Sequence, residues 1–165
     1  MTLPNLRQSY ALILLVVIGL MSYGLYTQYY LYLQPCPLCM TQRLFYCLIG
    51  AFAFVAFIHN GGVNSHRVYA SLMSLSALGG IGAAGRQVWM QYLPADEVPA
   101  CGPSLEYMLD TFPFAEAMKM LILGDGNCAE VIWTFLGFSM GEWSLACFIG
   151  LLAASLWQLL RPKQS

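Results

Sequence analysis

Four long stretches of this chain carry almost no charge, and they restrict its fold more than any other feature. A helix needs about 20 mostly apolar residues to cross the roughly 30 Å hydrocarbon core of a bilayer. The composition agrees, because 59% of the 165 residues are hydrophobic and only 9% are charged, outside the usual balance of soluble domains. We predict an all-α membrane protein, a four-transmembrane-helix bundle with spans at about 10–30, 37–58, 68–92 and 143–160.

The first two spans need a separate argument. The first apolar run is too long for a signal peptide and no small-residue cleavage site follows it, so we keep it as a membrane helix. The second has an uncharged core from Leu44 to Ile58, which is short for a span at about 1.5 Å per residue. We therefore expect this helix to begin near Pro37. No repeat or linker divides the chain, so we expect one membrane domain over residues 1–165.

The distribution of charge predicts which side each loop faces. Short cytoplasmic loops of membrane proteins carry an excess of Lys and Arg. Both ends of this chain and its middle loop carry four basic residues and no acidic ones, whereas the opposite side carries three basic residues and all eight acidic ones. We therefore expect cytoplasmic termini and two outer loops, at about 31–38 and 93–142. The four basic residues are Arg7, Arg67, Arg161 and Lys163.

The second outer loop is too long for a plain connection, which makes it a candidate functional segment. Within it, apolar residues recur with the spacing of one helix face, which predicts a short helix lying on the membrane surface. A small core helix within the loop is the alternative. The third span contains a run of small residues, 78–85, which predicts that a neighbouring helix approaches it closely. The apolar residues of the loop helix are Leu105, Met108, Leu109 and Phe112.

The cysteines follow this topology. Four of the six fall on the outer side, where thiols are oxidised, as one pair in each outer loop. The other two lie inside the second and fourth predicted spans, where we expect small buried apolar side chains. The outer pairs are Cys36 with Cys39 and Cys101 with Cys128; the remaining two are Cys47 and Cys147.

The close pair lies in the stretch QPCPLCMTQR, at the predicted start of the second span. The positive end of a helix dipole favours a thiolate, which is the reactive form of cysteine. Arg43 follows Cys39 by one helical turn, and helical side chains lean toward the N-terminus, so we expect its guanidinium near the Cys39 sulfur. Arg43 could also serve as an anchor at the lipid headgroups.

Three roles remain open for the four outer cysteines. They could form a zinc site, although only one pair has the close spacing of a zinc half-site. They could staple the loops, which suits Cys101 with Cys128, because closing a long loop stabilises a fold by about 2 to 4 kcal/mol. Redox cycling explains the close pair better. A disulfide across a two-residue spacer hardly restricts the unfolded chain, so it would stabilise the fold very little. A redox pair at the bilayer boundary indicates a lipid-soluble electron acceptor, and a quinone fits that description.

Four blocks of the sequence carry a resemblance to a known family. They are QPCPLCMTQR, GRQVWMQYLP, ACGPSLEYML and CAEVIWTFLGFSMGEWSL, in this order on the predicted topology. Through these blocks, essentially the whole chain resembles the bacterial disulfide bond formation protein B (DsbB) family. Proteins of this family carry electrons from DsbA to quinone. The resemblance implies a protein-disulfide:quinone oxidoreductase of the bacterial inner membrane that reoxidises a periplasmic thioredoxin-like oxidant of the DsbA type.

The resemblance also implies roles for individual residues. Cys101 would capture the partner, Cys128 would pass electrons to the close pair, and Cys39 would lie beside the quinone, either ubiquinone or menaquinone. Cys36 would complete the disulfide, and Arg43 would support the quinone and the thiolate electrostatically. Some relatives carry a histidine near the outer end of the third span.

At that position this chain reads GRQVWMQ, so the resemblance implies a quinone contact from Arg86 or Gln87 instead. Two alternatives stay open. One is a quinone-linked enzyme of the vitamin K epoxide reductase type, although the order of the cysteine motifs argues against it. The other is a non-catalytic membrane scaffold whose outer loops are stapled by disulfides.

Overall fold

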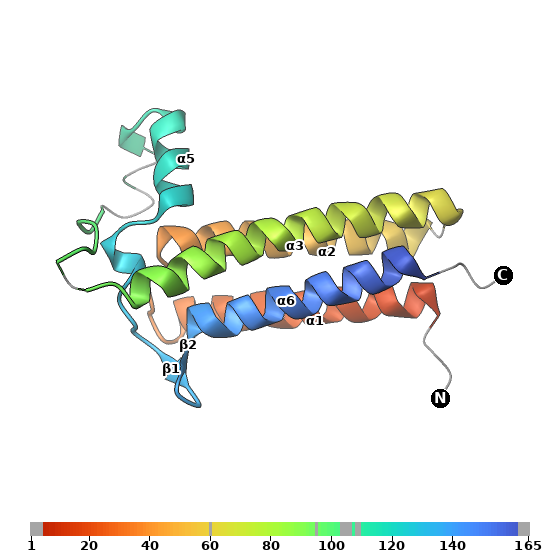
Figure 1. Ribbon diagram of the computed structural model, residues 1–165, viewed down its shortest axis with the longest axis horizontal. Coiled ribbons are helices and arrows are strands. Elements are labelled where there is room, and N and C mark those ends of the chain that lie inside the picture. The colour runs from red at the N-terminus through yellow and green to blue at the C-terminus, as the bar shows by residue number, and fades with distance from the viewer. Residues whose placement is uncertain (1–4, 60, 95, 103–106, 108–109, 162–165) are drawn as a thin grey trace.

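The computed structural model describes residues 5–59, 61–94, 96–102, 107 and 110–161. Four long helices lie side by side as a bundle (Figure 1). Each is long and apolar enough to cross a membrane, so the predicted four-span all-α fold is confirmed. The helices are α1 (Leu6–Tyr29), α2 (Pro37–His59), α3 (Val63–Gln91) and α6 (Met140–Leu160).

Local chemistry sets where the helices begin. The helix α2 begins at Pro37, as predicted, because proline suits the first helical position, where its missing N–H would have had no partner. The helix α6 begins at Met140 rather than near 143. The Ser139 hydroxyl accepts the Glu142 N–H at 3.2 Å, and the Glu142 carboxylate accepts the Ser139 N–H at 2.6 Å. This reciprocal capping box adds the first turn of α6.

The third span is also longer than predicted. The helix α3 begins at Val63, not near 68, so Arg67 lies inside a helix rather than in a middle loop. The charge of Arg67 had marked the end of the apolar run in the sequence. A helix can extend past the apolar run, because a side chain as long as arginine reaches water from its first turns.

The helices pack in the order α1, α2, α3 and α6, with each neighbouring pair in contact. The Tyr46 ring of α2 stacks on Phe148 of α6, with ring centroids 4.0 Å apart. Two glycines of α3 make this packing possible. A Cβ on Gly80 would overlap the Phe148 ring, and one on Gly79 would overlap Phe45 of α2. The close approach predicted from the run of small residues is thus confirmed.

The long outer loop contains more structure than predicted. It holds the helix α5 (Phe114–Leu123), the short 3₁₀ helix η1 (Gly126–Cys128) and a hairpin of β1 (Thr134–Phe135) and β2 (Phe138–Ser139). The predicted helix around 105–112 falls mostly outside the described residues. The sequence analysis missed α5, which begins directly after Pro113.

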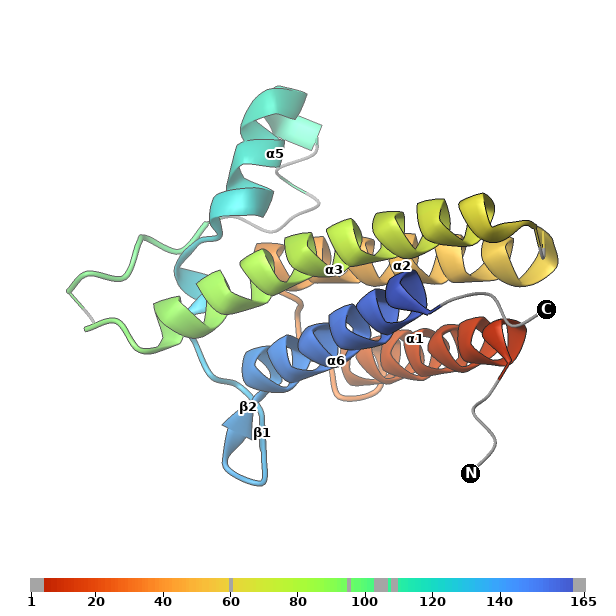
Figure 2. The same ribbon diagram turned by 45° about the vertical axis from the view of Figure 1, so that its right-hand side comes forward.

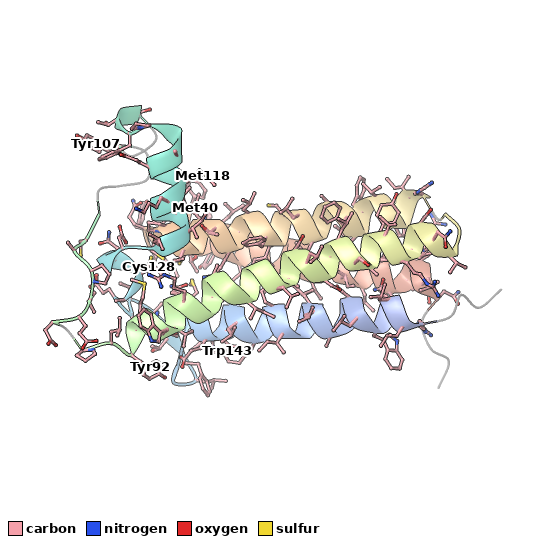
Figure 3. The ribbon with its side chains drawn as sticks, turned by 45° about the horizontal axis from the view of Figure 1, so that its top comes forward. Met40, Tyr92, Tyr107, Met118, Cys128 and Trp143 are labelled. Atoms are coloured by element: carbon pink, nitrogen blue, oxygen red, sulfur yellow. The ribbon has the colours of Figure 1, made fainter. Side chains whose placement is uncertain are left out.

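The helix α5 stands at a steep angle to the bundle in both ribbon views (Figures 1 and 2). The Thr41 hydroxyl of α2 donates to the Leu121 carbonyl of α5 at 2.7 Å. Figure 3 shows Met118 of α5 above the start of α2, where Met40 lies. The loop is therefore fastened to the end of the bundle.

The hairpin turns at Leu136 and Gly137, which have positive φ angles of 52° and 84°. Two-residue hairpin turns of this hand match the twist of the strands. The Trp143 indole N–H of α6 donates to the Phe135 carbonyl at 3.0 Å and holds the hairpin against the bundle.

The two outer loops and the helix ends near the termini lie at opposite ends of the molecule. Leu6 and Leu160, where the first and last helices meet the terminal segments, share one end (Figure 1). The helix α5, η1 and the hairpin share the other. All four outer-loop cysteines therefore lie at a single end of the bundle.

Candidate active site

The close cysteine pair caps the N-terminus of α2. Cys36 directly precedes the first helical residue, and its sulfur accepts the Cys39 backbone N–H at 3.4 Å. The two sulfurs lie 2.8 Å apart. Both therefore lie at the positive end of a helix dipole, where a thiolate is favoured.

A buried glutamine of α3 contacts both sulfurs. The Gln87 amide nitrogen lies 3.4 Å from the Cys39 sulfur and 3.7 Å from the Cys36 sulfur. Its amide oxygen accepts a hydrogen bond of 2.7 Å from Gln42 of α2. The sequence analysis named Gln87 but missed Gln42. A glutamine inside an apolar helix, one turn after Cys39, is the signal that could have revealed it, because polar groups within a membrane span are costly.

Cys128 of the long loop reaches the same pair. Its side chain is 1% exposed and packs with Cys36, Leu38 and Met90. Its interaction with the Cys36 thiol lowers the pKa of Cys128. The same interaction, together with that of Cys39 and with burial, raises the pKa of Cys36. The contact therefore favours the thiol form of Cys36 and the thiolate form of Cys128.

Cys101 lies on the exposed side of η1. Two hydrogen bonds hold the segment around it to η1. The Gly126 N–H donates to the Ala100 carbonyl at 3.3 Å, and the Gly102 N–H donates to the Asp125 carboxylate at 3.0 Å. A Cβ on Gly126 would lie 3.1 Å from the Cys101 sulfur. A glycine at this position thus lets Cys101 lie against the short helix that carries Cys128.

Asp125 organises this part of the loop. Its carboxylate is buried and also accepts the backbone N–H and the side-chain amide of Asn127, at 3.1 and 3.0 Å. It therefore joins the segment of Cys101 to the segment of Cys128. The sequence analysis missed Asp125, because its partner Gly102 lies far from it in the chain.

The two predicted arginines have different surroundings. Arg43 extends across to α1, where it donates to the Gly24 carbonyl at 2.8 Å and to the Gln28 side chain. Arg43 and Cys39 line the same cavity and interact electrostatically, as predicted, whereas the α3 side chain hydrogen-bonded to the Cys39 sulfur is Gln87. Arg86 donates to the Leu123 carbonyl of α5, and its guanidinium lies over the Trp89 ring at 5.6 Å.

A cavity of about 470 Å³ opens beside Cys39, between α1, α2, α6 and the hairpin. Cys39, Arg43 and Gln87 line it, whereas Arg86 does not. Its walls are otherwise mainly apolar, and such a volume is within the range of small-molecule sites. The aromatic wall consists of Tyr23, Tyr46, Trp133, Phe135 and Trp143.

A metal centre is the remaining arrangement to examine. Over the described part of the chain, no three His, Cys, Asp or Glu side chains are grouped so as to hold a metal ion. The cysteines instead form a line: exposed Cys101, then Cys128 on η1, against which Cys101 lies, then Cys36 and Cys39, and finally the cavity.

Four apolar helices with two cysteine pairs meeting at one end define a multi-pass membrane protein equipped for thiol–disulfide chemistry. Comparison with known proteins makes this class specific. The family model of disulfide bond formation protein DsbB matches residues 6–158. The chain therefore belongs to the DsbB family, as the sequence blocks indicated.

Three curated relatives, two named disulfide bond formation protein B and one disulfide bond formation protein B 1, illustrate the similarity. The protein of Saccharophagus degradans is 48% identical over 96% of this chain and 96% of its own length. That of Hahella chejuensis is 50% identical over 95% of this chain and 96% of its own length. The disulfide bond formation protein B 1 of Pseudomonas aeruginosa is 41% identical over 98% of this chain and 99% of its own length.

Proposed function

We propose that this protein is an oxidase of the bacterial inner membrane that reoxidises a periplasmic thioredoxin-like oxidant of the DsbA type. Electrons would pass through the two cysteine pairs to a membrane quinone, either ubiquinone or menaquinone. The observation that carries the proposal is the line of four cysteines, which runs from an exposed loop sulfur to a sulfur at the wall of an apolar cavity. Both termini would be cytoplasmic and the redox cysteines periplasmic.

The exchange with the partner would begin at Cys101. In the resting enzyme each cysteine pair would be a disulfide. A thiolate of the reduced partner attacks the exposed Cys101 sulfur, and the Cys101–Cys128 bond breaks. The second partner thiolate then attacks the mixed disulfide and releases the partner in its oxidised form. This sequence leaves Cys101 and Cys128 as a dithiol that holds the two electrons taken from the partner.

The electrons would then cross between the loops at Cys128 and Cys36. The thiolate is the attacking species in disulfide exchange, and the Cys128 side chain already packs against Cys36. Attack on Cys36 breaks the Cys36–Cys39 bond and frees the Cys39 thiolate at the cavity wall. Attack of Cys101 on Cys128 restores the loop disulfide and leaves the close pair as a dithiol.

The cavity fits a quinone ring. Its aromatic wall suits a flat apolar ring, and Arg43 and Gln87 add polar side chains to the lining beside Cys39. A bound quinone would supply an acceptor for the two electrons and two protons of the close pair. We assign the quinone contacts to Cys39, Arg43 and Gln87, and not to Arg86, which binds the end of α5.

The test uses the detergent-purified protein, a reduced thioredoxin-like partner from the periplasm and short-chain ubiquinone or menaquinone. Quinone absorbance and partner thiols are followed together. We expect one quinone consumed per two thiols, and no turnover with Cys39→Ser. If thiols persist with every quinone while the protein remains folded, the account fails, and a stapled scaffold of the same fold becomes the better explanation.

A further inference from the structure

Two buried glutamines meet between α2 and α3 beside the close cysteine pair. Gln42 and Gln87 are each only 5% exposed, and both lie in helices able to span a membrane. A polar amide in such a place is costly unless its hydrogen bonds are made. The 2.7 Å bond between the two side chains meets part of this need.

This bond fixes which way the Gln87 amide faces. The Gln42 nitrogen donates to the Gln87 oxygen, so the Gln87 nitrogen is left for the sulfurs of Cys39 and Cys36. Space on the other side is limited as well. A Cβ on Gly141 of α6 would lie 3.2 Å from the Gln87 amide carbon. The amide is thus held in one plane between α6 and the cysteines.

The fixed amide suits both protonation states of Cys39. Its oxygen lies 3.7 Å from the Cys39 sulfur and can accept the proton of a thiol. Its nitrogen lies 3.4 Å away and can donate to a thiolate. Arg43 makes its hydrogen bonds with α1 instead. Apart from the neighbouring Cys36 thiol, 2.8 Å away, the side chain that donates to the Cys39 sulfur is therefore that of Gln87.

We propose that Gln42 is a positioning residue, which holds the Gln87 amide so that its N–H faces the Cys39 sulfur and stabilises the thiolate there. This inference rests on the proposed function, because the thiolate matters when the close pair gives up its electrons. Without Gln42 the amide can turn, and its oxygen would then face the negative sulfur.

The test is a double-mutant cycle with Gln42→Leu, Gln87→Leu and the double variant. The protein is reduced and kept free of partner and quinone. Alkylation of each cysteine by a neutral reagent is then measured across pH by mass spectrometry of the separated peptides. We expect each single variant to lower the alkylation rate of Cys39 at neutral pH about tenfold, which corresponds to about 1.4 kcal/mol. The double variant should lose no more than either single one.

Gln42→Met provides a check of similar side-chain size. A thioether cannot donate to the Gln87 oxygen, so this variant should also lose about tenfold at neutral pH. Ser155→Ala is the matched control, since it removes a buried hydroxyl that donates to the Leu151 carbonyl within α6. It should leave the pH profile of Cys39 unchanged.

Additive losses in the double variant, or an unchanged Cys39 profile in both Gln42 variants, would overturn the inference. The proposed function is judged separately by quinone turnover of the unaltered protein. If the unaltered protein reduces no quinone, the proposed function fails, while the alkylation cycle still decides the role of Gln42.

Discussion

Replacing Asp125 with alanine should separate the two halves of the proposed electron path. The Asp125 carboxylate holds the Cys101 segment to η1 through the Gly102 N–H and supports η1 through both N–H groups of Asn127. Within the described part of the chain, its hydrogen bonds go to Gly102, Asn127 and Cys128 and not to the close cysteine pair. Its loss should therefore loosen Cys101 and Cys128 while Cys36 and Cys39 stay in place.

The magnitude follows from these three hydrogen bonds. A hydrogen bond to a charged group contributes roughly 1.5 to 3 kcal/mol, but the freed N–H groups of Asn127 can turn to water at the loop surface. Loss of a capping Asp side chain costs up to about 2 kcal/mol. We therefore expect Asp125→Ala to destabilise the docked loop by about 2 kcal/mol. This free energy lowers the population of the docked loop roughly 30-fold relative to open forms.

Two electron donors distinguish the halves of the path. A protein dithiol of the DsbA type must enter at Cys101, whereas a small dithiol such as dithiothreitol can also reduce the close pair directly. In Asp125→Ala, quinone reduction driven by the protein partner should fall strongly, and reduction driven by the small dithiol should be kept. The matched variant Asp96→Ala changes an acidic residue elsewhere in the loop and should preserve both activities.

Equal loss of both activities in Asp125→Ala would refute the reasoning, because the damage would then extend to the close pair or the whole fold. Unchanged turnover with the protein partner would refute it too, since the carboxylate would then not hold the two loop segments in register.

Two further predictions concern packing and protonation. Gly80→Ala should destabilise the purified protein by about 1 to 3 kcal/mol, because the added methyl group would overpack against Phe148. Gly82→Ala should be neutral, because a Cβ there meets no neighbour within 4 Å. Equal melting temperatures for the two variants would contradict the packing. Cys36→Ala should raise the pKa of Cys128, because the interaction that lowers it is removed, so the Cys128 thiolate should persist to lower pH in the unaltered protein. Cys36→Ser keeps an O–H donor and should fall between them, which alkylation of Cys128 across pH would measure; identical profiles in all three would contradict the contact.

The bundle could be predicted from the sequence because its signals are local. Uncharged length gives the spans, Pro37 gives the start of α2, and Gly79 and Gly80 indicate the close helix contacts. The limits of α3 and α6 were less accurate, because a charged residue such as Arg67 ends an apolar run without ending a helix. The capping box at Ser139 could have been noticed, since its residues are close in the sequence.

The site was only partly predictable because its contacts join distant segments. The cysteine spacing identifies the residues that carry the chemistry, but nothing local shows that Cys128 lies against Cys36. The pairing of Gln42 with Gln87 depends on how α2 and α3 pack, and that of Asp125 with Gly102 on how the loop folds back. The sequence placed Arg43 near Cys39 but could not show its hydrogen bonds to Gly24 and Gln28, because these acceptors belong to α1.

The most direct test of the electron path is to trap its crossing point. In a Cys39→Ser, Cys101→Ser double variant, Cys36 and Cys128 lack their usual partners, and mild oxidation followed by peptide mass spectrometry shows which disulfide forms. The account predicts a dominant Cys36–Cys128 disulfide, because the structure places these two side chains in contact. If these two cysteines stay reduced, or pair with Cys47 or Cys147 instead, electrons do not cross between the loops at this point and the proposed path is wrong.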